Sequence, residues 1–103
     1  LVRVRGDSME PILTESDVVL LDTSWVEVPI GRKRPSGAHA RYMVALEIEG
    51  EARVKWAERP NEGTLVIFSE NSSEYGPEYF LRSEIQKIRL IGRVVWWCHT
   101  VRE

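Results

Sequence analysis

The apolar residues of this chain come in short runs closed by turn-forming residues, and none has the length and period of a long amphipathic helix. Residues 1–5 alternate apolar and basic side chains, which is the period of a half-buried strand. Turn-forming clusters at 35–37, 60–63 and 71–77 separate the runs. The pattern predicts a mostly β domain of many short strands, arranged as a sandwich or a partly open barrel. We expect strands at 1–5, 18–21, 42–48, 52–56, 65–68 and 88–97, a hairpin turn at 49–51, a bulge at Gly92, and short helical pieces at 9–13 and 83–86.

Size and composition limit what such a domain can be. The 103 residues allow one domain, expected to span 1–103, and the first residue, Leu1, suggests a piece of a longer protein. One cysteine cannot form an internal disulfide, and with two histidines it cannot complete a four-ligand zinc site, so we expect no metal and no cofactor. No apolar run approaches the roughly 20 residues that span a bilayer. We therefore expect a cytoplasmic protein without a membrane segment, and the net charge of −2 gives no overall attraction for nucleic acid.

A serine stands at the most informative turn, in the sequence Gly-Asp-Ser-Met-Glu-Pro from Gly6 to Pro11. Glycine allows a sharp bend there. Ser8 has two interpretations at this position. Its hydroxyl can cap a short helix by accepting a backbone N–H, which is the commoner role of such a serine. Alternatively it is a nucleophile, and it then needs a base to take its proton.

The sequence offers two kinds of base. A histidine, His39 or His99, could serve in a Ser-His-Asp arrangement, with Asp7, Asp17 or Asp22 as the acid. The other kind is a lysine, and the candidates are Lys33, Lys55 and Lys87. Neither histidine lies in a recognisable motif, and Lys33 lies in a basic loop open to solvent screening.

Lys55 differs because it lies within a predicted strand, which would hold it rigidly. A free lysine has a pKa near 10.4 and is protonated at neutral pH. Burial against apolar neighbours would have to lower the pKa of Lys55 to about 7 or 8 before it could act as a base. The alternative is an ordinary solvent-facing lysine on an edge strand.

The segment from Val4 to Pro11 resembles the nucleophile segment of the LexA-type self-cleaving repressors, which include phage repressor C-terminal domains and the UmuD polymerase accessory protein. The fold and Ser-Lys chemistry of bacterial signal peptidases are similar. Further resemblances follow in the same order at 17–22, at 54–56 around the lysine, at 69–77 with the pattern Ser-x-Asn…Tyr-x-Pro, and at 91–96. Ser16 stands where a glycine is usual, and the loop 28–41 and the stretch 71–77 are longer than usual.

The resemblance implies a LexA- or signal-peptidase-like β fold with Ser8 as nucleophile and Lys55 as general base. The oxyanion would be held by the backbone N–H groups of Asp7 and Ser8. The expected substrate is an Ala-Gly or Cys-Gly bond in the protein's own linker, upstream of this domain, and cleavage would relieve repression. This chain contains neither dipeptide. Operator DNA would be bound by an N-terminal helix-turn-helix domain, and a RecA filament or an antirepressor would act as the trigger.

Members of the family dimerise through the C-terminal segment. The candidate residues here belong to the apolar stretch 90–101, namely Val94, Val95, Trp96 and Trp97. The alternative place of the two tryptophans is the core. Two other functions stay open: a dimerisation module that does not cleave, and a UmuD-like partner of a translesion polymerase.

Overall fold

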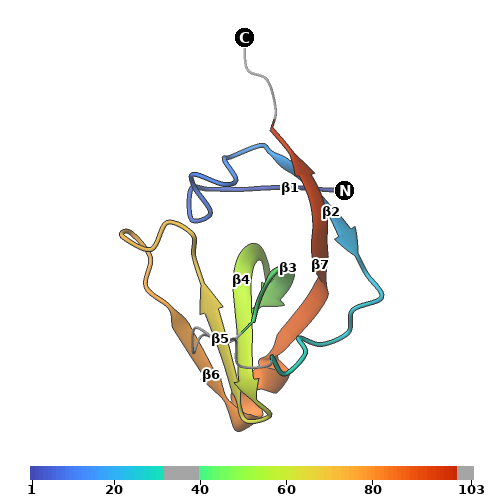
Figure 1. Cartoon of the computed structure of the whole chain (residues 1–103), viewed down its shortest axis with the longest axis vertical. Coiled ribbons are helices and arrows are strands. Elements are labelled where there is room, and N and C mark those ends of the chain that lie inside the picture. The colour runs from blue at the N-terminus through green and yellow to red at the C-terminus, as the bar shows by residue number, and fades with distance from the viewer. Residues whose placement is uncertain (32–39, 100–103) are drawn as a thin grey trace.

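A computed structural model, in which residues 1–31 and 40–99 are described, contains one seven-stranded antiparallel sheet (Figure 1). The strands follow the order β1-β2-β7-β3-β4-β5-β6 across the sheet, and the sheet is not closed into a barrel. The mostly β fold expected from the sequence is confirmed, with all strands in one open, curled sheet. The elements are β1 (Val2–Arg3), β2 (Val18–Asp22), β3 (Arg41–Ile48), β4 (Glu51–Asn61), β5 (Thr64–Phe68), β6 (Glu78–Leu81), the 3-10 helix η1 (Arg82–Lys87) and β7 (Ile88–Cys98).

The central strand β3 is apolar along most of its length because both of its faces are covered. Val44, Leu46 and Ile48 pack into one core cluster with residues of β4 and β5. Met43, which points to the other face, packs into a second cluster with Met9 and other residues near the N-terminus. A strand buried on both faces needs a near-continuous apolar run rather than alternation. Two cores on opposite faces of the curled sheet follow from this.

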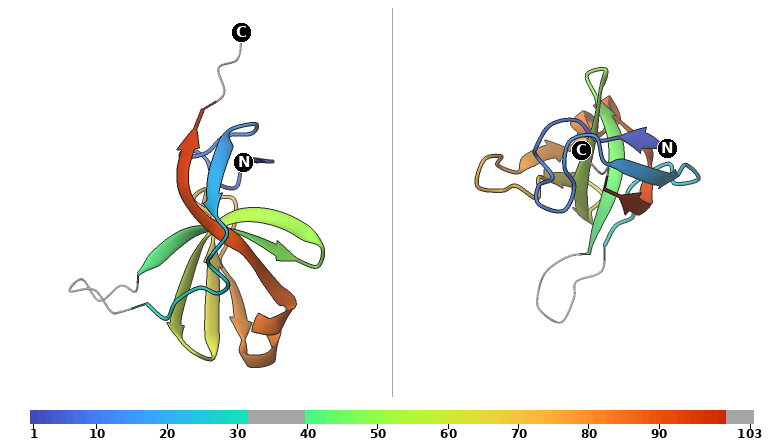
Figure 2. Two further views of the ribbon diagram at one scale, coloured as in Figure 1. Left: turned by 90° about the vertical axis from the view of Figure 1, so that its right-hand side faces the viewer. Right: turned by 90° about the horizontal axis from the view of Figure 1, so that it is seen from above.

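The long strand β7 joins the two parts of the sheet, as Figure 2 shows. Its first half pairs with β3 and its second half pairs with β2, with register shifts opposite Ala45/Leu46 and Leu20/Leu21. The bulge expected at Gly92 is therefore confirmed, because Gly92 pairs with Ala45 directly after the first shift. A Cβ at Gly92 would lie 2.8 Å from the backbone oxygen of Asp22, so a glycine is needed where the strands come this close.

Two local predictions need correction. Residues 9–13 form turns rather than a helix, although the N–H of Leu13 donates to the carbonyl of Met9 at 2.9 Å. Pro11 explains the difference, because the residue before a proline is disfavoured in the helical region. The edge strand β6 was not predicted, and β4 extends five residues beyond the predicted end at Trp56. The helical piece expected at 83–86 is present as η1.

Candidate active site

Ser8 lies in the turn that follows β1, and the buried residue that follows the serine anchors this turn in the core. Gly6 adopts φ +75°, a left-handed conformation that permits the chain to reverse direction. Met9, directly after the serine, is 1% exposed and packs into the second core cluster. Ser8 itself is half-buried. The chain thus buries the residue after the serine and leaves the serine at the surface of a cleft.

The loop after β5 fastens the serine turn from the side. The backbone N–H of Asn71 donates to the carbonyl oxygen of Ser8 at 2.9 Å, and its side-chain Nδ2 donates to the carbonyl oxygen of Asp7 at 3.2 Å. The Tyr75 hydroxyl donates to Asp7 Oδ1 at 2.5 Å. This carboxylate raises the pKa of the Tyr75 hydroxyl, since it accepts the proton in the hydrogen bond and repels the phenolate. Three hydrogen bonds therefore join segments more than sixty residues apart in sequence.

Lys55 lies on β4 and is buried, with 8% of its surface exposed. Its Nζ donates to the hydroxyl oxygen of Ser69 at 2.8 Å, and it lies 5.4 Å from the centre of the Tyr75 ring. Burial lowers the pKa of Lys55 below its ordinary value, and the positive charge of Arg53 lowers it further. The carboxylates of Glu78, Glu51 and Asp7 act in the opposite direction but do not outweigh burial. The solvent-facing alternative for Lys55 is therefore wrong.

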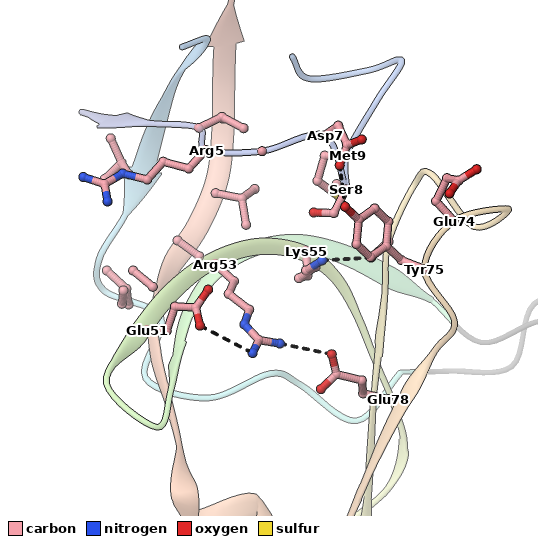
Figure 3. A pocket seen from close by; sticks show the side chains of 18 of the residues that line it. Arg5, Asp7, Ser8, Met9, Glu51, Arg53, Lys55, Glu74, Tyr75 and Glu78 are labelled. Atoms are coloured by element: carbon pink, nitrogen blue, oxygen red, sulfur yellow. Dashed lines mark hydrogen bonds and ion pairs between the residues drawn. The ribbon is translucent and has the colours of Figure 1, made fainter. Parts of the chain in front are cut away.

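Ser8 and Lys55 line the same cleft, which has a volume of about 960 Å³ (Figure 3). Within the described residues no hydrogen bond joins the Ser8 hydroxyl to Lys55 Nζ, which bonds to Ser69 instead. An ion pair of 3.0 Å between Arg53 Nη1 and Glu78 Oε1 crosses the cleft wall below Lys55, and Glu51 lies 3.8 Å from the same guanidinium. A hydroxyl and a buried amine of lowered pKa thus line one open cleft, which also holds the ion pair of Arg53 with Glu78.

Among the described residues, the candidate bases His99 and Lys87 and the candidate acids Asp17 and Asp22 do not line this cleft. His99 Nδ1 lies 2.6 Å from Oδ2 of the buried Asp17, which also accepts a hydrogen bond from the Thr14 N–H. Asp22 accepts hydrogen bonds from both the N–H and the hydroxyl of Ser24. Lys87 is exposed on η1. His39 and Lys33 lie outside the described residues.

The helix-cap interpretation of Ser8 loses its basis, because the serine precedes turns instead of a helix. Across residues 1–31 and 40–99 there is no group of three or more His, Cys, Asp or Glu side chains placed to hold a metal ion. In the same part of the chain no helix is both long and apolar enough to cross a membrane.

The four residues proposed for dimerisation divide into two groups. Val94 is 7% exposed and packs in the second core cluster, because it pairs with Leu21 on the inner side of β7. The assignment of Val94 to the dimer interface is therefore wrong, because its side chain packs inside the domain. Val95, Trp96 and Trp97 are between 42% and 53% exposed. Stretch 100–101 of the predicted segment lies outside the described residues.

Sequence reasoning missed three residues that shape the site, Ser69, Asn71 and Tyr75. All three belong to the Ser-x-Asn…Tyr pattern noted above, so the signal was present. A pattern carries no pairing information, however, and the contacts to Lys55 and to the serine turn appear only in three dimensions.

The fold and this site define a class of protein. The sequence profile of the Peptidase S24-like family matches residues 1–95, and the chain belongs to this family, that of LexA, UmuD and the phage repressors. A curated relative is the HTH-type transcriptional regulator PrtR of Pseudomonas aeruginosa, which is 30% identical over 102 residues. The match covers 97% of this chain and 36% of the relative, so the chain spans about a third of that protein's length.

Proposed function

We propose that this chain is the peptidase and dimerisation domain of a LexA-type transcriptional repressor, and that it cleaves the linker between itself and a DNA-binding domain. The observation that carries the proposal is the common cleft, with the half-buried Ser8 beside the buried Lys55. The family match supports a peptidase, and the name of the relative supports a transcription regulator. In this proposal the linker and the helix-turn-helix domain, which binds operator DNA, lie outside this chain.

In the proposed reaction the neutral amine of Lys55 takes the proton of the Ser8 hydroxyl, and the Ser8 oxygen attacks the carbonyl carbon of the linker peptide bond. The backbone N–H groups of Asp7 and Ser8 hold the resulting oxyanion. They have no acceptor within the described residues. The ammonium of Lys55 then returns the proton to the leaving amine. A water molecule, deprotonated by the same amine, hydrolyses the Ser8 ester.

Ser69 is the proposed positioning residue for Lys55. The 2.8 Å hydrogen bond fixes one side of Nζ and leaves its other side for Ser8. The Ser69 hydroxyl accepts a hydrogen bond from the ammonium and can donate one to the neutral amine, so it can hold Lys55 in both protonation states. Removing the Ser69 hydroxyl should leave the Lys55 amine present but less firmly positioned.

The test is self-cleavage of the intact protein between pH 7 and 10. Cleavage should accelerate with pH and level off once Lys55 is neutral, because only the unprotonated amine can accept a proton. Ser8→Ala and Lys55→Ala should each slow it by at least about a thousandfold. Ser69→Ala should slow it roughly tenfold, as expected for a loosened catalytic group.

The matched controls are Lys87→Ala and Ser83→Ala, which change exposed residues of η1. Both should cleave at the rate of the unchanged protein. Full cleavage in Ser8→Ala or Lys55→Ala would reject the dyad. Absence of cleavage in the unchanged protein at pH 10 would favour the non-cleaving dimerisation module, an alternative supported by the bond of Lys55 to Ser69 in place of Ser8.

The dimer part of the proposal rests on the outer surface of the β2–β7 pair. Trp96 pairs with Leu20, which is 42% exposed, so two apolar side chains lie on the same side of adjacent strands. Val95 is also exposed, whereas Trp97 pairs with the buried Val19 and so lies on the opposite side of the two strands. Exposed apolar groups gathered in this way are typical of an interface core.

A further inference from the structure

The carbonyl oxygen of Asp7 accepts two hydrogen bonds, one from within the serine turn and one from outside it. The N–H of Glu10 donates to this oxygen at 3.1 Å, and Nδ2 of the Asn71 side chain donates to it at 3.2 Å from the loop after β5. The carboxylate of Asp7 accepts the separate hydrogen bond from Tyr75. Because a carbonyl oxygen has two lone pairs, Glu10 and Asn71 together use its full capacity. The turn itself supplies one of these donors, and Asn71 supplies the other.

The Asn71 side chain is oriented by a neighbour in its own loop. The Ser73 hydroxyl donates to Oδ1 of Asn71 at 3.3 Å, and Nδ2 on the other side of the amide group donates to the Asp7 carbonyl. The backbone N–H of Asn71 donates separately to the carbonyl oxygen of Ser8. The backbone contact attaches the loop to the serine turn without any help from the side chain. Attachment alone therefore does not explain the side-chain contact.

The geometry of the peptide bond shows what the side-chain contact controls. The carbonyl of Asp7 and the N–H of Ser8 belong to one planar trans peptide unit, in which they point in opposite directions. Fixing the carbonyl therefore also fixes the direction of the Ser8 N–H. This N–H has no acceptor within residues 1–31 and 40–99. A carbonyl that accepts hydrogen bonds also polarises its peptide unit, which makes the N–H a stronger donor.

We propose that Asn71 is a positioning residue for the oxyanion donors, and that its Nδ2 holds the Asp7–Ser8 peptide unit so that the Ser8 N–H is directed at the oxygen of the attacked carbonyl. The inference rests on the proposed function, because an oxyanion arises only if Ser8 attacks a peptide bond. Asn71 is not among the residues that line the Ser8 cleft, so it acts through this peptide unit and not by contact with the substrate. Donors that are already directed at the oxyanion need no reorganisation during the reaction.

The test is the pH dependence of self-cleavage in the intact protein, measured in Asn71→Ala and in the control Ser72→Ala, which changes an exposed residue of the same loop. Loss of one oxyanion donor typically lowers kcat by about 10²–10³, so a donor that is kept but misdirected should lower it about ten- to thirtyfold. Asn71→Ala should lower the plateau rate at high pH by this factor. The midpoint of the profile should stay in place, because Asn71 is not among the groups that shift the pKa of Lys55.

A second variant covers the case in which Asn71→Ala does not fold. Asn71→Asp keeps the shape of the side chain and the acceptor for Ser73, but it places an oxygen against the Asp7 carbonyl. It should lower the plateau at least as much as Asn71→Ala, and its added negative charge should move the midpoint to higher pH. Rates are compared at a temperature at which circular dichroism shows each variant to be folded. A plateau in a folded Asn71 variant equal to that of Ser72→Ala would overturn the inference.

A further measurement does not depend on cleavage. The amide nitrogen resonance of Ser8 in this 103-residue chain responds to hydrogen bonding at the Asp7 carbonyl, which belongs to the same peptide unit. The resonance should move in the Asn71 variants and not in Ser72→Ala, and an unmoved resonance would overturn the inference. If the unchanged intact protein does not cleave at any pH, the proposed function fails and the catalytic role of Asn71 fails with it. If the unchanged protein and the folded Asn71 variants cleave equally fast, only the positioning role is lost.

Discussion

Gly92→Ala tests the junction that holds the two halves of the site together. Ser8 is carried by the segment between β1 and β2, and Lys55 by β4, and β7 connects these parts by pairing with β2 and with β3. Gly92 lies at the change of partner. An added Cβ would lie 2.8 Å from the backbone oxygen of Asp22 and 3.2 Å from its carbonyl carbon. The first contact is about 0.5 Å shorter than an ordinary C···O contact.

Rotation of a side chain cannot relieve the clash, because the two nearest atoms belong to the backbone of Asp22. Gly92 also pairs with Ala45 of β3, so β7 is held from both sides and the strands have to separate. Overpacking of this kind typically costs 1–3 kcal/mol, about 2 kcal/mol at the middle of the range. For a domain of this size each kcal/mol lowers Tm by about 4–8 °C. We therefore expect Gly92→Ala to lower Tm by roughly 5–20 °C.

The assay is thermal unfolding followed by circular dichroism, with Gly63→Ala as the control. A Cβ at Gly63 would make contacts of 3.5 and 4.0 Å, which are ordinary van der Waals distances. The control should retain the Tm of the unchanged protein within about 3 °C. If cleavage is measured as well, Gly92→Ala should lose more activity at low temperature than its folded fraction explains, because Ser8 moves relative to Lys55. An unchanged Tm for Gly92→Ala would refute the argument that β2 and β7 are too close for a side chain.

Three further predictions concern the site and the interface. Because the pKa of Lys55 is lowered, the folded state binds fewer protons than the unfolded state between that pKa and 10.5, and the free energy of unfolding should rise with pH in this interval. Lys55→Met should remove this rise, which urea titrations at several pH values would measure. An unaltered slope in Lys55→Met would contradict the assignment of the rise to Lys55. Tyr75→Phe removes the hydrogen bond to Asp7 and should accelerate hydrogen exchange at the amide of Asn71, which donates to the serine turn. The control Tyr79→Phe, on the exposed β6, should leave this exchange rate unchanged. Equal effects of the two variants would show that Tyr75 does not hold the serine turn in place. Trp96→Asp should convert a dimer into a monomer in sedimentation, and Tyr79→Asp should not; a dimer that survives Trp96→Asp would place the interface elsewhere.

The strands were predictable where sequence period and burial agree. Strand β3 and its hairpin with β4 appear as predicted, because the apolar run and the turn at Gly50 are local features, and Gly50 has φ +79°. Strand β6 was missed because only Phe80 among its residues is half-buried, and an exposed edge strand leaves little apolar period. The helix predicted at 9–13 was wrong because the apolar residues of this buried turn have the same spacing as those on one face of a helix.

The site was predictable as a set of residue types but not as an arrangement. Ser8 and Lys55 could be named from the sequence, and the burial that a lysine base requires is observed at Lys55. The partner of Lys55 was not predictable, since Ser69 is adjacent only through the pairing of β4 with β5. Val94 shows the same limit, because alternate residues of β7 face the core or solvent according to bulges that a single sequence does not locate well.

The position of β7 in the sheet has a consequence for biosynthesis. It is the last strand along the chain, yet it lies between β2 and β3, near the middle of the sheet. During translation β2 and β3 emerge from the ribosome long before the strand that must fill the space between them. The sheet therefore cannot join the part carrying the serine turn to the part carrying the lysine until β7 has been made. A chain that ended before residue 88 would lack β7, and no strand would then join β2 to β3 in one sheet.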